Sequence, residues 1–324
     1  IQNGSESGIY CQGSSPTLKN LIITNNTASD YGGGGIYCNS NANPSLENIT
    51  IINNSATGSS GRGGGMRCNT NSNPSLVSVL ISGNTSSQEG GGVFIFNSNP
   101  SFENVTITGN LSSINEGDGI FIKNNSNPNL LNTILWDNGN ELEFSDVDVS
   151  STITISYSNI EDGQDSIVTN DNGTVTWGAG NIDVDPMFVD TANGNYHLLA
   201  SSQCINGGDP TTFDSDGSRA DMGANPYLNS YSGPTWYVET EGNDTTGTGA
   251  TDNPFRSIQA GINFSSAADS VTVAAGTYVE NINFRGRNIQ VVGVNRETTI
   301  IDGDSSGVVV TFENSEDSTA VLSG

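Results

Sequence analysis

Apolar and polar residues alternate in a pattern that recurs five times within the first 140 residues of the chain. Each copy has a Gly-rich start, an alternating apolar triplet, an Asn-Pro or Ser-Pro corner and a second alternating stretch that ends in Asn, as in GGIYCNSNANPSLENITIINN from Gly34. Successive corner prolines lie 28, 30, 26 and 28 residues apart; they are Pro16, Pro44, Pro74, Pro100 and Pro128. A period of this length, with strands of period two inside it, predicts a solenoid of stacked β-rungs.

Alignment of the five copies predicts which side chains form the interior. Strand alternation sends every second side chain to the same face, so equivalent positions form columns that run across the rungs. In the first stretch the inward columns are Ile9, Ile36, Met66, Val93 and Ile120, followed by Cys11, Cys38, Cys68, Ile95 and Ile122. In the second stretch they are Leu18, Leu46, Leu76, Phe102 and Leu130, followed by Ile23, Ile51, Ile81, Ile107 and Leu135. Because three cysteines share a column with aliphatic residues, we expect them to be small buried hydrophobes.

One Asn in each copy occupies the same turn position. This column consists of Asn26, Asn54, Asn84, Asn110 and Asn138. Asn tolerates the left-handed backbone conformation, and stacked amides can hydrogen-bond to one another along a solenoid. We therefore expect a structural ladder of asparagines.

A fourth kind of column is aromatic and is predicted on the face opposite the inward positions. Its members are Tyr10, Tyr37, Arg67, Phe94 and Phe121. An exposed aromatic row could stack on sugar rings, or its rings could stack on one another from rung to rung. We favour the second interpretation, because Arg67 interrupts the row.

These columns resemble those of right-handed parallel β-helix proteins of the pectin-lyase-like type, which are common on bacterial surfaces. The resemblance implies an all-β fold, a right-handed parallel β-helix solenoid. Residues 181–227 resemble the closing rungs of such proteins and contain DPMFVD, NYHL, GGDP and DMGA in that order. Residues 235–294 resemble an opening segment, with WYV, GND, NPFRSIQAGI and VTVAAGTYVENI. The opening segment implies one short capping helix near 255–266, with an apolar stripe of Phe255, Ile258, Ile262 and Phe264.

The predicted organisation has three parts. Residues 1–140 are regular β-helix rungs, residues 141–230 are irregular rungs and a closing segment, and residues 231–324 open a following β-helix module. A closing signal thus precedes an opening signal, and both ends of the chain fall in mid-rung. Open rungs expose unpaired strand edges, which can pair with a neighbour. The predicted assembly interface consists of Ile1, Gln2, Ile9, Cys11, Val310, Phe312, Val321 and Leu322.

Composition and charge limit the classes of molecule that the chain is expected to bind. The formal net charge is −26, with only nine Lys and Arg residues, which disfavours nucleic acid and anionic membrane surfaces. No apolar stretch reaches the roughly 18 residues of a membrane span, and no signal segment opens the sequence. We therefore expect no membrane insertion and a mature, exported form. Of the four cysteines, the sequence assigns no partner to Cys204.

No catalytic constellation is evident. In the repeats, the bases Lys19, Arg62, Arg67 and Lys123 are scattered over different rungs, and the carboxylates Glu47, Glu103 and Asp118 look isolated. Paired carboxylates or a base beside a metal would be needed for a glycosidase or lyase. The single histidine, His197, lies in NYHL, where the resemblance implies a structural strand. Asp183 and Asp185 are better explained as a capping turn than as a catalytic pair.

Calcium is the one cofactor that the sequence suggests. DSDGSRAD places Asp214, Asp216 and Asp221 around Gly217, and Asp209 lies just before them. Alternate carboxylates around a glycine turn can converge on Ca²⁺, although the full EF-hand pattern with its final Glu is absent. A solvated Asp-Gly turn is the competing interpretation. A second acidic loop, around Asp244 and Asp252, is a weaker candidate.

The sequence as a whole predicts a non-catalytic structural protein, secreted or held at a bacterial cell surface and adhesin-like. Two interpretations of the open rungs stand side by side. The chain is the repeating subunit of a fibre of identical copies joined head to tail, or it is a slice of a large surface protein. The alternative function is a secreted β-helix that binds or degrades carbohydrate, as a lyase or glycosidase, so glycans are further candidate partners.

Overall fold

The structure is a computed structural model that describes residues 1–29, 32–147 and 149–324. The chain divides into two compact units. The first comprises residues 1–185, 207–212 and 220–225, and the second comprises residues 186–206, 213–219 and 226–324. This division differs from the predicted boundary near residue 230, because the predicted closing segment is shared between the two units.

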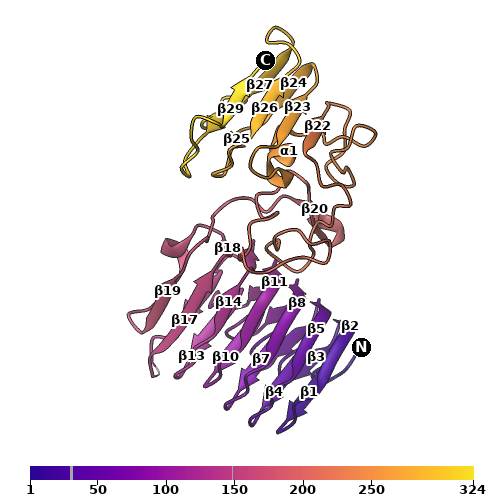
Figure 1. Cartoon of the computed structure of the whole chain (residues 1–324). Coiled ribbons are helices and arrows are strands. Elements are labelled where there is room, and N and C mark those ends of the chain that lie inside the picture. Colours follow the sequence, from indigo (N-terminus) through magenta and orange to yellow (C-terminus); the bar gives the residue numbers. More distant parts are fainter. Residues whose placement is uncertain (30–31, 148) are drawn as a thin grey trace. The chain divides into compact units, whose positions relative to one another are not determined.

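The first unit is a parallel β-helix with three strand faces (Figure 1). The first face contains β1 (Ile9–Gln12), β4 (Ile36–Asn39), β7 (Met66–Asn69), β10 (Val93–Phe96), β13 (Ile120–Lys123) and β16 (Leu142–Phe144). The second face contains β2 (Thr17–Thr24), β5 (Ser45–Ile52), β8 (Ser75–Ser82), β11 (Ser101–Thr108), β14 (Asn129–Leu131), β15 (Ile134–Trp136), β17 (Ser151–Ser156), β18 (Asn159–Ile160) and β19 (Gly173–Trp177). The third face contains β3 (Thr27–Ser29), β6 (Ser55–Thr57), β9 (Thr85–Ser86) and β12 (Leu111–Ser112).

The register of the rungs confirms the predicted columns. On the first face Ile9 pairs with Ile36 and Cys11 with Cys38, and the same positions continue through β7, β10 and β13. Apart from Ile9, Cys11 and Leu18 on the edge strands β1 and β2, the column residues are fully buried, and together they form one continuous core. Cys11, Cys38 and Cys68 are buried as free thiols, as expected from their column. Apolar side chains of like size, stacked at the roughly 4.8 Å spacing of neighbouring strands, bury one another without a second layer.

The asparagine ladder is also confirmed, with one difference in its backbone. From Asn54 onward, the Oδ1 atom of each ladder Asn accepts hydrogen bonds from the main-chain N–H and the side-chain amide of the Asn one rung before it, at 2.9–3.1 Å. The left-handed residue is the one that precedes the ladder position, for example Asn25, Asn53 and Gly83, with φ values of 53°, 55° and 63°. The preceding residue therefore makes the turn, and the ladder Asn fills it.

The aromatic column is partly covered, so the prediction of an exposed row is wrong for its later members. Tyr10 is 52% exposed, but Phe94 and Phe121 are only 2% and 3% exposed. The guanidinium of Arg67 lies between the rings of Tyr37 and Phe94, at 5.2 and 5.5 Å from their centroids. Arg67 thus continues the stack as a cation–π contact. The predicted rung-to-rung stacking is confirmed for Tyr10 with Tyr37 and for Phe94 with Phe121.

Glycines in the preceding loops let the chain cover these rings. Gly90 and Gly117 have φ values of 74° and 56°, and a Cβ on either would come within 3 Å of the Cβ of Phe94 or Phe121. The loops that contain Gly90 and Gly117 therefore lie directly against the aromatic column. A side chain at either position would push its loop away from the column.

The predicted closing segment lies partly along the outside of the second face. The main-chain N–H of Asp209 donates to Asn132 Oδ1 at 2.6 Å, and that of Ala224 donates to Thr106 Oγ1 at 2.9 Å. The strand NYHL is β21 (Asn195–Leu198), which pairs antiparallel with β20 (Phe188–Asp190) in the second unit. The strands of the closing segment therefore do not extend the parallel sheets of the first unit.

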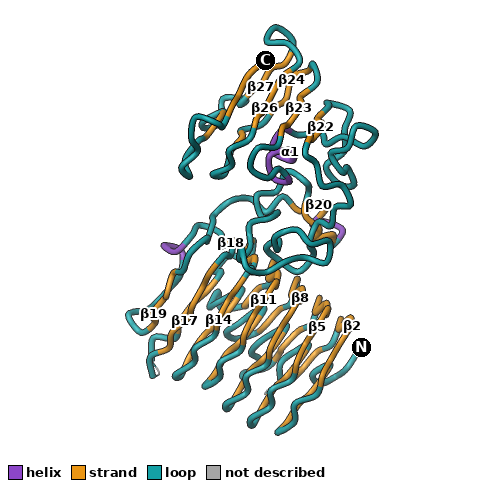
Figure 2. The backbone as a smooth tube through the Cα atoms, in the orientation of Figure 1, coloured by secondary structure: helices purple, strands orange, loops and turns teal. Residues whose placement is uncertain are grey.

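The second unit is a shorter parallel β-helix. Its longest sheet contains β22 (Thr235–Val238), β23 (Ser270–Val273), β26 (Gln290–Gly293) and β29 (Val321–Ser323). Two narrower sheets contain β24 (Gly276–Val279) with β27 (Thr299–Asp302), and β25 (Ile282–Asn283) with β28 (Val310–Thr311). Figure 2 shows the helical segments as short purple turns; they are α1 (Ile258–Phe264) and the single 3₁₀ turns Gln164–Ser166 and Thr191–Asn193.

The helix α1 confirms the short helix predicted near residues 255–266. Ser257 Oγ accepts from the main-chain N–H of Ala260, and the Glu280 carboxylate accepts from the N–H groups of Ile258 and Gln259 at 2.8 and 3.0 Å. These bonds satisfy donors that a helix start leaves free. Burial raises the pKa of Glu280 to about 7. The predicted stripe faces the core, where Phe255 and Ile262 are fully buried.

We expect the ladder to contribute strongly to stability. Asn84→Ala leaves the main-chain N–H of Asn54 without its acceptor, takes one of three acceptors from the Asn54 side-chain amide, and removes the donor to Ile51 O. Each buried unsatisfied group costs roughly 1–3 kcal/mol, so the free energy of unfolding should fall by about 3 kcal/mol or more in urea titrations. Asn73→Ala, at an exposed Asn of the same rung, is the matched control and should change it by about 0.5 kcal/mol or less. Equal losses in the two variants would contradict the ladder's role.

Candidate functional site

One end of the first unit presents an incompletely covered rung. The edge strands of its three faces are β1, β2 and β3. Ile9 and Leu18 are only partly buried, whereas their column neighbours Ile36 and Leu46 are fully buried. Above β2, Ile1 O accepts from the N–H of Thr24 at 2.9 Å, and the N–H of Gly4 donates to Asn26 Oδ1 at 2.9 Å. The first four residues therefore form part of a preceding rung and supply a partner to the ladder.

In the second unit, β29 is an edge strand of the longest sheet. Its inward column runs through Trp236, Val271, Val291 and Leu322, which pair in register. The first three are at most 2% exposed, but Leu322 is 43% exposed. A cavity of about 250 Å³ opens beside it, lined by Ile258, Val273 and Ile301. The apolar interior thus reaches the surface at this rung.

The eight predicted interface residues lie on the outermost rungs of the two units. Val310 lies in β28, which pairs in parallel with β25. The ring of Phe312 stacks on that of Phe284, with centroids 4.2 Å apart. Phe312, Ile1 and Leu322 are all largely exposed apolar side chains. No structural observation shows what covers them, so the interface stays a prediction.

The asparagine ladder ends on a carboxylate that sequence analysis missed. The Glu141 oxygens accept from the main-chain N–H and the side-chain amide of Asn138 at 2.8 and 2.6 Å. Glu141 therefore occupies the place of a sixth ladder amide. Its pKa is raised to about 8, chiefly by burial and also by the Glu161 carboxyl, while the two bonds from Asn138 oppose the shift. The departure from the Asn repeat at this position was the only sequence signal.

Carboxylates meet near Glu143, which the sequence did not predict. Glu143 follows Phe121 in the aromatic column and accepts from Gly117 N at 3.0 Å and from Asn140 Nδ2 at 2.6 Å. Burial, followed by the charges of Glu143 and Glu89, raises the pKa of Glu116. Asp118 is fully buried and accepts from the N–H groups of Ser112 and Asn140, which corrects its expected isolated, outward placement. Loop amides thus hold the carboxylates of Glu143 and Asp118, which accounts for both as parts of the fold.

The repeat-block bases are held in structural contacts. Arg62 forms an ion pair with Glu89 at 2.5 Å, and Lys123 approaches the same carboxylate at 3.6 Å. Lys19 forms an ion pair with Glu47 one rung away. Each base thus has a carboxylate or an aromatic ring beside it, as Arg67 does.

The predicted calcium residues are not gathered into a ligand set. Across residues 1–29, 32–147 and 149–324, no group of three or more His, Cys, Asp or Glu side chains is placed to hold a metal ion. Asp209 accepts from Thr211, and Asp216 accepts from Ser218 and from the N–H of Asn229, which lowers the pKa of Asp216 against the opposing effect of burial. Asp214 caps a turn that ends at Gly217, and Asp221 is buried. Calcium binding at these residues therefore stays a prediction.

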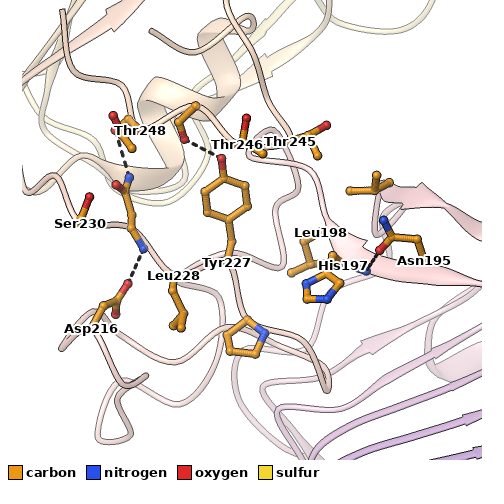
Figure 3. A pocket seen from close by; sticks show the side chains of 14 residues that line it. Asn195, His197, Leu198, Asp216, Tyr227, Leu228, Ser230, Thr245, Thr246 and Thr248 are labelled. Carbon is orange, nitrogen blue, oxygen red and sulfur yellow. Dashed lines mark hydrogen bonds between the residues drawn. The ribbon is translucent and has the colours of Figure 1, made fainter. Parts of the chain in front are cut away.

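A cleft of about 570 Å³ with a mixed apolar and polar lining lies in the second unit (Figure 3). Figure 3 shows Tyr227 in the centre of the cleft, with His197 and Asn195 of β21 on one side and Asp216 on the other. Tyr227 donates to Gly247 O at 2.6 Å, and burial raises the pKa of its hydroxyl. His197 is exposed, and its main-chain N–H donates to Asn195 Oδ1 at 3.2 Å. The cleft offers hydroxyl, amide and imidazole groups around one aromatic ring.

Comparisons with known proteins agree with this architecture. Residues 1–113 match the family model of the right handed beta helix region, and residues 240–308 match a family described as a protein of unknown function (DUF1565). Searches of the curated proteins and of the solved structures returned no match. Together with the parallel rungs, the family matches show a right-handed parallel β-helix repeat protein of the pectin-lyase-like fold. In the part of the chain that the structure describes, no helix has the length and apolar character to cross a membrane.

We expect stability to depend on pH through the end of the ladder. The pKa of Glu141 in the folded chain, about 8, lies above the roughly 4.3 of a free Glu. Its contribution is therefore fully present below pH 4.3 and is lost as the pH rises through 8. Glu161→Gln removes the carboxyl that shares this proton, so the fall in the free energy of unfolding between pH 5 and pH 8 should shrink.

The expected change is about 1.4 kcal/mol for each unit by which the variant lowers the pKa of Glu141. Denaturant titrations at pH 5 and pH 8 measure it. Glu47→Gln, at an exposed glutamate, is the control and should keep the parent slope. An unchanged slope in Glu161→Gln would show that the Glu141–Glu161 pair does not set the dependence.

Proposed function

We propose that the chain is a non-catalytic extracellular structural unit, a surface-fibre subunit whose copies join head to tail through their open rungs. One observation carries this proposal: an inward apolar column continues to the edge strand β29, where its last member, Leu322, is exposed. A further parallel rung would bury this side chain and pair the unpaired edges of β1 and β29. A head-to-tail contact that does not close into a ring extends into a filament, which is the assembly that we propose.

The energetics favour such a junction. Full burial of a Leu side chain contributes roughly 1.5–3 kcal/mol, and strand pairing satisfies a row of main-chain groups as well. Exposed edges without a charge or a covering loop readily pair with another chain. The outermost β29 carries Val321, Leu322 and Ser323, none of which is charged.

Net charge opposes association and makes it salt-dependent. Each copy carries a formal charge of −26, so copies repel one another at low ionic strength. Salt at 0.1 M reduces the range of that repulsion to about 10 Å. Filaments should therefore form more readily as salt rises, which distinguishes this junction from one based on ion pairs.

A test uses the purified chain over a range of concentration and salt, with negative-stain electron microscopy as the readout. We expect filaments in the parent chain and dispersed particles in Leu322→Lys, because a lysine in the junction would be buried without a partner. Val308→Lys is the matched control at a side chain that is 68% exposed and outside the inward column, and it should still assemble. Dispersed particles in the parent at every condition would overturn the proposal, as would filaments of Leu322→Lys.

A second candidate function, glycan binding, is favoured by the cleft of Figure 3. Hydroxyl and amide groups around an aromatic ring suit a sugar, and they lie in a hollow, whereas the aromatic column of the first unit is largely covered. We expect His197→Ala to weaken glycan-array signals at least tenfold and Tyr10→Ala to leave them unchanged. The opposite outcome would place sugar binding on the aromatic column, and the absence of signal for the parent chain would remove this candidate.

A further inference from the structure

Positive charge in this acidic chain gathers at one place in the second unit. Three of the nine basic residues, Arg219, Arg285 and Arg287, lie close enough that the first two lower the pKa of Arg287. The fold thus brings three guanidinium groups of this acidic chain to one region of the second unit.

The end of α1 holds two of these arginines in place. Arg285 Nη1 donates to Asn263 Oδ1 at 2.7 Å and to Ile205 O at 2.9 Å. Arg287 donates to the carbonyl of Ile262, in the last turn of the helix. Cations at a helix C-terminus are stabilised by its carbonyl groups. These bonds fix the position of the two guanidinium groups, and the oxygens that accept them are uncharged carbonyl and amide oxygens.

Arg287 lacks a compensating anion. Burial is the largest cause of its lowered pKa, followed by the charges of Arg285 and Arg219, and no carboxylate raises it. Among the described residues, Arg287 forms no ion pair. Asp216, which lines the same pocket as Arg287, accepts instead from Ser218 and from the N–H of Asn229.

Arg287 lines a pocket of about 440 Å³ whose wall is mostly polar. Ser218, Ser265 and Ser266 contribute hydroxyl groups, and Tyr231 and Trp236 contribute aromatic surface. Arg219 lines the same pocket. A planar guanidinium presents paired donors that fit carboxylate, sulfate and phosphate oxygens.

We propose that this pocket binds an oxyanion, the carboxylate, sulfate or phosphate group of a small polar ligand, with Arg287 as its charge partner. The bound group replaces the missing counter-charge and accepts hydrogen bonds from the serine hydroxyls. The aromatic wall accommodates the body of the ligand. The site is separate from the open rungs, so it adds a binding function to the structural one.

The experiment is isothermal titration calorimetry of the full chain with sodium sulfate, sodium phosphate and sodium glucuronate, each against sodium chloride of equal ionic strength. Glucose is the neutral control for glucuronate. We expect saturable binding of at least one anion and none of glucose. Preference for glucuronate would identify a carboxylated sugar, and preference for sulfate or phosphate would identify that group. No saturable heat from any of the three anions would overturn the proposal.

Variants locate the site. Arg287→Gln should weaken anion binding at least tenfold, whereas Arg296→Gln, at an exposed arginine, should leave it unchanged. Because Arg287 also bonds to the end of α1, Arg287→Lys provides a second variant that keeps the charge. It should retain more affinity than Arg287→Gln while losing the paired donors. Parent-like affinity in a folded Arg287→Gln, verified by circular dichroism, would place the anion elsewhere and overturn the assignment.

Discussion

The structure depends on parallel pairing of successive rungs in register, which keeps side chains of the same kind stacked over one another. Because each rung repeats the same short pattern, a shift by one residue would turn the whole inward column outward. The hydrophobic interior is therefore a set of parallel columns, and its stability accumulates from neighbour to neighbour. The same geometry explains why an end rung is incomplete: every rung needs a neighbour on both sides.

The turns between strands obey the same constraint through the asparagine ladder. A buried turn leaves main-chain N–H groups without water, and the amide of the next rung accepts from them. Gly4 supplies the donor above Asn26, and Glu141 supplies the acceptor below Asn138. The ladder thus ends within the chain on a carboxyl group whose burial makes it sensitive to pH.

The periodic features could be predicted from the sequence, because each one is set by residues a fixed number of positions apart. The inward columns, the ladder, the buried cysteines and α1 with its apolar stripe are of this kind. Features that depend on aperiodic loops could not be predicted. The cover over Phe94 and Phe121 requires loop glycines whose backbone angles the repeat does not determine. Asp118 looked isolated because its donors, Ser112 and Asn140, lie in such loops.

The candidate binding residues of the irregular part could not be predicted either, because no repeat places them at fixed spacings. Arg219, Arg285 and Arg287 are separated by up to 68 residues and share no motif, so only the folded chain brings them together. The residues of the cleft in Figure 3 come from three separate segments of the second unit. The predicted calcium residues show the converse, since closeness in sequence did not produce a common ligand set.

The central claim is that a further rung from another copy completes the open rungs. Hydrogen–deuterium exchange at increasing protein concentration tests it directly, because it reports on the edge amides themselves. The account predicts that amides of β1 and β29 exchange quickly in dilute solution and become protected, together, as concentration rises, while interior strands such as β8 are protected throughout. Edge amides that exchange quickly at every concentration would contradict it.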